Sequence, residues 1–290
     1  MSLFFDPAGE VRSGFRAILF FVLVFLVLVI SQALVKLVGL GDGTLYQAVL
    51  YPLEAIGTLG VSALAFQWLD HRSLAALGFR KMRSSPLFWG GALGGLLAIS
   101  VVFVVVWLQV RGNGYLFAQP GVLIHREFLM WLTVFFFAAS VEEMIFRGYP
   151  FLALRKSLGR WGASLPLSVL FAAGHPSFYH SGAALLSTFL GGIFLTQLFV
   201  LAESLWLPIG FHFGWNLAQS LIYPLPGRTR TLVSLTNFDP AALGVTKGAE
   251  QSPWAVVLLL GLTIVAETLV RKKDSIGAGR MKEQSKNAGR

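Results

Sequence analysis

Long apolar runs follow one another along most of the chain, and this feature constrains the fold more than any other. A bilayer-spanning helix needs about 20 mostly apolar residues. Six runs meet that length clearly: Ala17–Val35, Leu45–Leu69, Leu87–Val110, Gly182–Ala202, Ser204–Tyr223 and Pro253–Val270. Two further runs are weaker, because Phe128–Phe146 contains acidic residues and Gly162–Gly174 is short. We therefore expect an all-α polytopic integral membrane protein, with residues 1–290 forming a single transmembrane domain of eight transmembrane helices.

The composition excludes an ordinary soluble enzyme. Apolar residues make up 55% of the chain and charged residues 13%, whereas a soluble domain carries about 25% charged residues. The chain has no cysteine, which excludes thiol catalysis and thiolate metal sites.

The net charge of +9 does not indicate nucleic-acid binding, because the basic residues flank the apolar runs. Such clusters are typical of cytoplasmic segments beside anionic lipid. They are concentrated on the side that holds the N-terminus and a basic tail at residues 271–290. We therefore expect a multi-pass protein of the cell membrane with both termini in the cytoplasm.

Ionisable residues inside a membrane span are costly, so each one requires an explanation. Glu142, Glu143 and Arg147 form the densest such group. Glu143 and Arg147 are four residues apart and can pair on a helix, while Glu142 points about 100° away from Glu143. The spacing predicts one carboxylate held by Arg147 and one that is free for chemistry, although an ion-paired helix end fits the spacing equally well.

Two further polar groups lie in apolar helices. His175 directly follows the run Gly162–Gly174, and His212 and Asn216 share a helix face within the run Ser204–Tyr223. Each alone is more typical of a packing residue that forms a hydrogen bond. Together with Glu142 they would supply the parts of a hydrolytic site. Glu54 and His180 remain less favoured candidates for the same site.

The three motifs resemble those of a known family. Glu142-Glu143-x-x-x-Arg147, Phe171-x-x-x-His175 and His212-x-x-x-Asn216 occur in the order found in the CPBP family. This family contains the type II CAAX prenyl endopeptidases and their prokaryotic, Abi-like relatives. The specific resemblance covers about residues 128–217, and the chain is most similar to the prokaryotic branch.

The resemblance implies an intramembrane endopeptidase that hydrolyses peptide bonds of membrane-associated substrates, including lipidated, CAAX-type ones. It implies that Glu142 is the general base, that His175 is its catalytic partner, and that His212 and Asn216 stabilise the oxyanion. Glu143 and Arg147 would then hold Glu142 in place.

The dependence on a metal stays open at this point. Glu142, His175 and His212 would form a zinc site of a known type, but a glutamate that binds the metal cannot also be the free base. There is no His-Glu-x-x-His element, in which the base is separate from the ligands. We therefore favour water activated by Glu142 without a required cofactor, with zinc as the alternative.

Two other classes of function compete with the protease. A non-catalytic membrane scaffold, such as an immunity protein, is compatible with the family resemblance. A transporter would also place polar residues at mid-membrane, but it usually shows repeated halves, and the sequence has no such symmetry.

Overall fold

The structure is a computed structural model that describes residues 10–41, 43–79, 85–109, 116–118, 126–179, 181–223, 233–235 and 251–288. These residues contain eight α-helices: α1 (Ser13–Leu37), α2 (Thr44–Leu69), α3 (Ser85–Gln109), α4 (Arg126–Phe146), α5 (Tyr149–Ala173), α6 (Gly182–Ala202), α7 (Trp206–Leu217) and α8 (Pro253–Ala288). Short helical turns are η1 (Leu74–Leu77), η3 (Pro176–Phe178) and the π-helix η4 (Ala218–Ile222). Two strands, β1 (Leu116–Ala118) and β2 (Val233–Leu235), pair antiparallel.

The all-helical membrane fold predicted from the sequence is confirmed, and the described part of each apolar run is mainly helical. The fifth helix differs most from its prediction, because α5 begins at Tyr149 rather than near Gly162. It is interrupted at Gly159, whose φ of 71° lies in the left-handed region that glycine tolerates. The apolar run in the sequence therefore identified only the segment of α5 that follows this kink.

The count of eight membrane spans is not confirmed. Within the described residues, six helices are long and apolar enough to cross a bilayer. The difference has two causes. Helices α4 and α5 follow each other so closely that residues 127–173 form one continuous candidate, and α7 has only 12 residues before it continues into η4.

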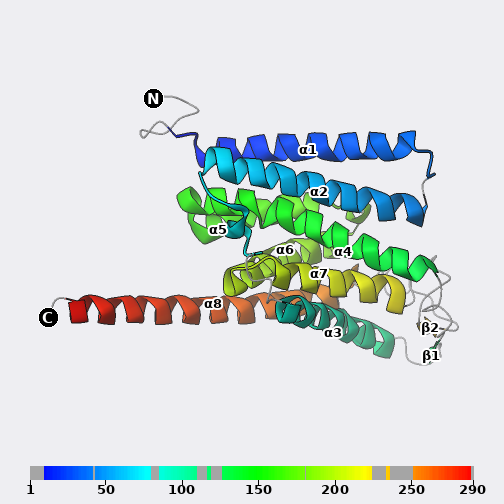
Figure 1. The fold of residues 1–290 in the computed structure, drawn as a ribbon. Helices are drawn as coiled ribbons and strands as arrows, with labels where there is room; N and C mark the ends of the chain where they lie inside the picture. The colour runs from blue at the N-terminus through cyan, green and yellow to red at the C-terminus, as the bar shows by residue number, and fades with distance from the viewer. Residues whose placement is uncertain are drawn as a thin grey trace.

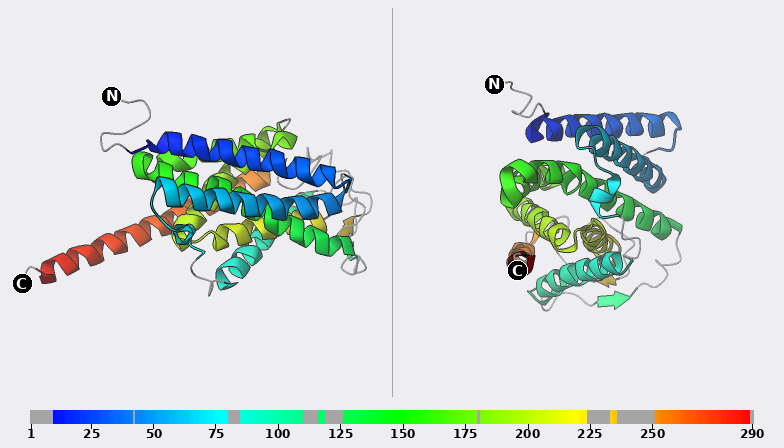
Figure 2. Two further views of the ribbon diagram at one scale, coloured as in Figure 1. Left: turned by 45° about the horizontal axis from the view of Figure 1, so that its top comes forward. Right: turned by 60° about the vertical axis from the view of Figure 1, so that its left-hand side comes forward.

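The helices form a layered bundle (Figures 1 and 2). Helices α1 and α2 pack together and cover α4 and α5 from one side. On the other side α6 packs against α5 and α8, while α7 packs against α3 and α4. Helices α4 to α7 therefore lie in the interior. They carry the predicted site residues or face them.

Helices α3 and α7 are in direct backbone contact. Gly95 of α3 lies so close to Phe211 that an added methyl group would clash with its carbonyl oxygen, and Gly214 of α7 has the same relation to Ala92. Gly91 and Gly210 repeat the arrangement one turn earlier. Small residues allow such approach in membranes.

The start of α1 and the end of α8 lie at the same end of the bundle (Figure 1). The basic segment predicted at residues 271–290 is helical as far as Ala288, because α8 continues through it without a break. With 36 residues and a rise of about 1.5 Å each, α8 is longer than the hydrocarbon core is thick. Its C-terminal part therefore extends beyond the bundle.

The backbone contact between α3 and α7 gives a first prediction. Gly95→Ala should lower the stability of the purified protein by about 1–3 kcal/mol, because the methyl group forces the two helices apart. Gly90→Ala is the matched control, since Gly90 lies on the same helix with open space around it. The measurement is thermal unfolding in detergent, and equal effects of the two substitutions would contradict the proposed close packing.

Candidate active site

The two adjacent glutamates of α4 have opposite environments. Glu143 is fully buried, with 0% of its side chain exposed, whereas 30% of the Glu142 side chain is exposed at a pocket. The roughly 100° rotation between neighbouring helix positions separates them in this way. These surroundings agree with the expected division, in which Glu143 is held by Arg147 and Glu142 is free.

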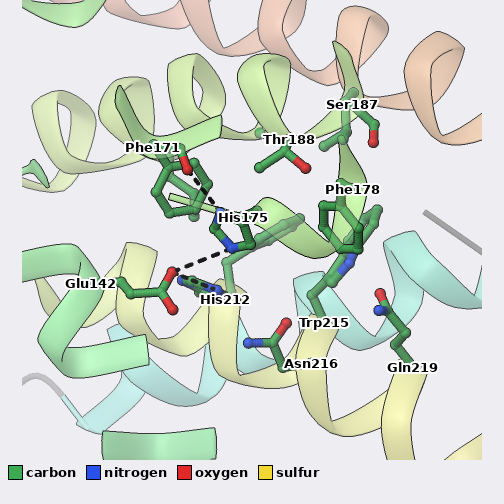
Figure 3. A pocket seen from close by; sticks show the side chains of 14 residues that line it. Glu142, Phe171, His175, Phe178, Ser187, Thr188, His212, Trp215, Asn216 and Gln219 are labelled. Carbon is green, nitrogen blue, oxygen red and sulfur yellow. Dashed lines mark hydrogen bonds and ion pairs between the residues drawn. The ribbon is translucent and has the colours of Figure 1, made fainter. Parts of the chain in front are cut away.

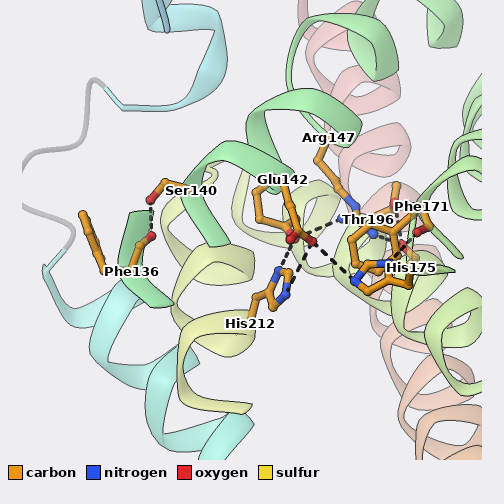
Figure 4. A network of polar contacts seen from close by, with 10 residues as sticks. Phe136, Ser140, Glu142, Arg147, Phe171, His175, Thr196 and His212 are labelled. Atoms are coloured by element: carbon orange, nitrogen blue, oxygen red, sulfur yellow. Dashed lines mark hydrogen bonds and ion pairs between the residues drawn. The ribbon is translucent and has the colours of Figure 1, made fainter. Parts of the chain in front are cut away.

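Glu143 is the centre of a buried polar network, whose members Arg147 and His212 are labelled in Figure 4. Its Oε1 accepts a hydrogen bond from Nη1 of Arg147 at 3.0 Å, so the predicted i,i+4 pair is confirmed. The same oxygen lies 2.9 Å from Nδ1 of His212 on α7. Glu143 therefore holds His212, a role that the sequence reasoning missed because the two residues are 69 positions apart.

Arg147 connects this network to α5 and α6. Its Nη2 donates to the carbonyl oxygen of Gly192 at 2.9 Å. Its guanidinium carbon lies 4.3 Å from the centre of the Phe171 ring, within the range of a cation–π interaction. Only 1% of the Arg147 side chain is exposed, so these contacts take the place of water around the charge.

The two histidines face Glu142 with the same ring nitrogen (Figure 3). Nε2 of His175 and Nε2 of His212 each lie 3.8 Å from Oε2 of Glu142. In both rings Nδ1 has another partner. Nδ1 of His212 lies near Glu143, as described above, and Nδ1 of His175 lies 2.7 Å from the carbonyl oxygen of Phe171. A carbonyl oxygen can only accept, so Nδ1 of His175 carries a hydrogen, and Nε2 of the neutral ring presents a lone pair.

The pocket has a volume of about 130 Å³ and continues from these groups along α7. Its aromatic and aliphatic lining comes mainly from Phe171, Phe178, Leu195, Phe211, Trp215 and Leu259. Its remaining polar lining is neutral and consists of Ser187, Thr188, Asn216 and Gln219. The structure therefore brings Glu142, His175, His212 and Asn216 to one pocket, as the motif spacing predicts.

Gln219 was missed by the sequence reasoning although a signal for it exists. His212, Asn216 and Gln219 occupy positions i, i+4 and i+7, which share one face of a helix. The same rule that grouped His212 with Asn216 therefore extends to Gln219, which follows in the π-helical turn η4.

The remaining candidates for the site have different outcomes. Glu54 of α2 is buried, but it does not line the pocket. His180 lies outside the described residues.

The donor types at the pocket fit zinc. Oε2 of Glu142 is buried and has no hydrogen-bond partner among the described residues, and two imidazole nitrogens face it. Histidines that bind metals usually have the other ring nitrogen bonded to a carboxylate or carbonyl oxygen, which is the arrangement of His212 and His175. Among the described residues, no three His, Asp or Glu side chains lie close enough together to hold a metal ion without moving.

Comparison with known proteins identifies a family for the central part of the chain. Residues 124–218 match the family model described as type II CAAX prenyl endopeptidase Rce1-like. No curated protein and no solved structure matches the chain. All three motifs lie within the matched residues, so the family resemblance inferred from the motifs is confirmed.

The contrast between the two glutamates predicts different effects on stability. Glu143→Gln should lower the free energy of unfolding by about 3–5 kcal/mol, because it leaves the buried Arg147 without its charged partner. Glu142→Gln, the matched control, should change it by less than about 1 kcal/mol. Unfolding of both purified variants measures the difference, and a Glu143→Gln protein as stable as the control would refute the structural role.

Proposed function

Because the chain carries a domain of the type II CAAX prenyl endopeptidase Rce1-like family at residues 124–218, we propose that it cleaves peptide bonds within the membrane by means of water activated by Glu142. The observation that best supports this chemistry is the convergence of Glu142, His175 and His212 at one pocket, with both Nε2 atoms 3.8 Å from Oε2 of Glu142. The substrates are membrane-associated peptides or proteins, including lipidated CAAX-type ones.

The proposed reaction begins with a water molecule between Glu142 and the imidazoles. The water donates one hydrogen bond to Oε2 of Glu142 and the other to an Nε2 lone pair, which leaves an oxygen lone pair free to attack the peptide carbonyl. As the bond forms, the proton passes to Glu142. The same proton is then delivered to the leaving amine, so Glu142 acts first as base and then as acid.

The negative charge that develops on the carbonyl oxygen requires a donor. We assign this role to the side-chain amide of Asn216, which lines the pocket one helical turn after His212. His212 contributes when its ring is protonated, because Nε2 then becomes a donor as well. One such donor is typically worth about 10²–10³ in rate.

The orientation in the membrane belongs to the same proposal. We place both termini in the cytoplasm, because Lys and Arg are concentrated in the segments that the sequence assigns to the same side as the two termini. The start of α1 and the end of α8 lie at one end of the bundle (Figure 1), in agreement with this placement. We also assign the chain to the prokaryotic branch of the family.

The role of Glu142 can be tested directly. Glu142→Gln should abolish cleavage of a fluorogenic lipidated peptide by purified protein, because an amide cannot accept the proton from water. The variant should remain folded, which unfolding measurements would verify. Turnover near the wild-type rate would show that the general base lies elsewhere. A wild-type protein that cleaves no such peptide would instead favour a non-catalytic scaffold.

The dependence on a metal requires a separate experiment. If zinc binds, Glu142, His175 and His212 would hold it, and it would polarise the carbonyl or the attacking water. Without a required metal, activity should survive exhaustive chelation, His175→Ala should be almost inactive, and Asn216→Ala should lose about 10²–10³ of the rate. Near-stoichiometric zinc, with activity lost on chelation and restored by zinc, would overturn the metal-free mechanism.

A further inference from the structure

One polar group in the pocket has no role in the chemistry proposed above. Gln219, in the π-helical turn η4, points its carboxamide into the pocket beyond Trp215 and Asn216 (Figure 3). Its Oε1 is shielded from solvent and has no hydrogen-bond partner among the described residues. A shielded carbonyl oxygen without a donor is costly, so this atom needs a partner from outside the described residues.

The other polar groups nearby are already satisfied. The hydroxyls of Ser187 and Thr188, which also line the pocket, both donate to the carbonyl oxygen of Ala184. They therefore resemble ordinary hydroxyls of a membrane helix, which bond to the preceding turn. Gln219 differs from them, because its acceptor faces the space that a substrate would enter.

The chemistry of a carboxamide indicates what binds there. Oε1 accepts one hydrogen bond and Nε2 donates two, so a glutamine side chain complements the N–H and C=O groups of a peptide main chain. No Lys or Arg is among the residues that line the described pocket. An uncharged main-chain segment therefore fits this end of the pocket better than a carboxylate does.

The position of Gln219 relates it to the reacting bond. Asn216 and Gln219 are three residues apart on one face, which is about 4.5 Å along a helix axis. An extended peptide advances about 3.3 Å per residue. A peptide whose scissile carbonyl lies at Asn216 would therefore present a main-chain group to Gln219 one or two residues away.

We propose that Gln219 is a substrate-positioning residue, whose carboxamide hydrogen-bonds the main chain of the bound peptide one or two residues from the scissile bond. This inference rests on the proposed peptidase function, since it concerns how the same pocket holds its substrate. It predicts that Gln219 recognises a backbone N–H of the substrate peptide and not one of the peptide's side chains.

The test pairs a change in the protein with a change in the peptide. A set of fluorogenic peptides is prepared in which each amide near the scissile bond is N-methylated in turn, which removes one N–H. With wild-type protein, one of these peptides should have a kcat/KM about 3- to 10-fold lower than the others, which is the range expected for one neutral hydrogen bond. With Gln219→Met, that difference should disappear, because the acceptor is already absent.

The effect should fall on binding rather than on chemistry. Gln219→Met should raise KM for the unmodified peptide by about 3- to 10-fold and leave kcat largely unchanged, as expected for an interaction made equally in ground and transition states. Gln67→Met is the matched control, because Gln67 is an exposed glutamine of α2 that does not line the pocket. It should leave both constants unchanged.

The outcomes separate this inference from the proposed function. If wild type cleaves the peptides and Glu142→Gln does not, but Gln219→Met retains the full N-methyl penalty, the positioning role is wrong and the peptidase remains. A loss of kcat in Gln219→Met that is the same for all peptides also overturns the inference, because a general structural role would produce it. If wild type cleaves none of the peptides, the proposed function itself fails.

Discussion

The site depends on one buried carboxylate. Oε1 of Glu143 is bonded to Arg147 within α4 and to His212 on α7, and Arg147 is in turn bonded to Gly192 of α6 and packed on Phe171 of α5. Four helices are thus joined through the Glu143–Arg147 pair in an apolar interior. A buried ion pair gains little net stability because both charges lose water. Its effect here is to tie α4 to α7 through His212 and to α6 through Gly192.

The same network determines which atoms face the substrate. Since Glu143 takes Nδ1 of His212 and the backbone of Phe171 takes Nδ1 of His175, both rings turn Nε2 toward Glu142. Glu142 is next to Glu143 in the chain, yet it faces the pocket because neighbouring helix positions diverge. One carboxylate therefore orients the imidazoles, and its neighbour is left for proton transfer.

Much of this arrangement could be predicted because it is encoded locally. Apolar runs identified the helices, and spacing of four residues identified the Glu143–Arg147 pair and the shared face of His212 and Asn216. The bond between Glu143 and His212 could not be predicted, because no local rule relates residues so far apart in the sequence. The start of α5 was missed for a different reason, since the kink at Gly159 separates a first part that carries Arg155 and Lys156 from the apolar second part.

The short helix α7 raises the question of how its side chains keep their position. With 12 residues it is too short to be fixed by the thickness of a bilayer. It is held instead by its backbone, because Gly210 and Gly214 lie against the main chain of α3 where no side chain fits between them. Side-chain contacts can adjust by rotation about their bonds, but two backbones in contact cannot. The glycines of α7 therefore set the depth of His212, and the bond to Glu143 sets the direction of its ring.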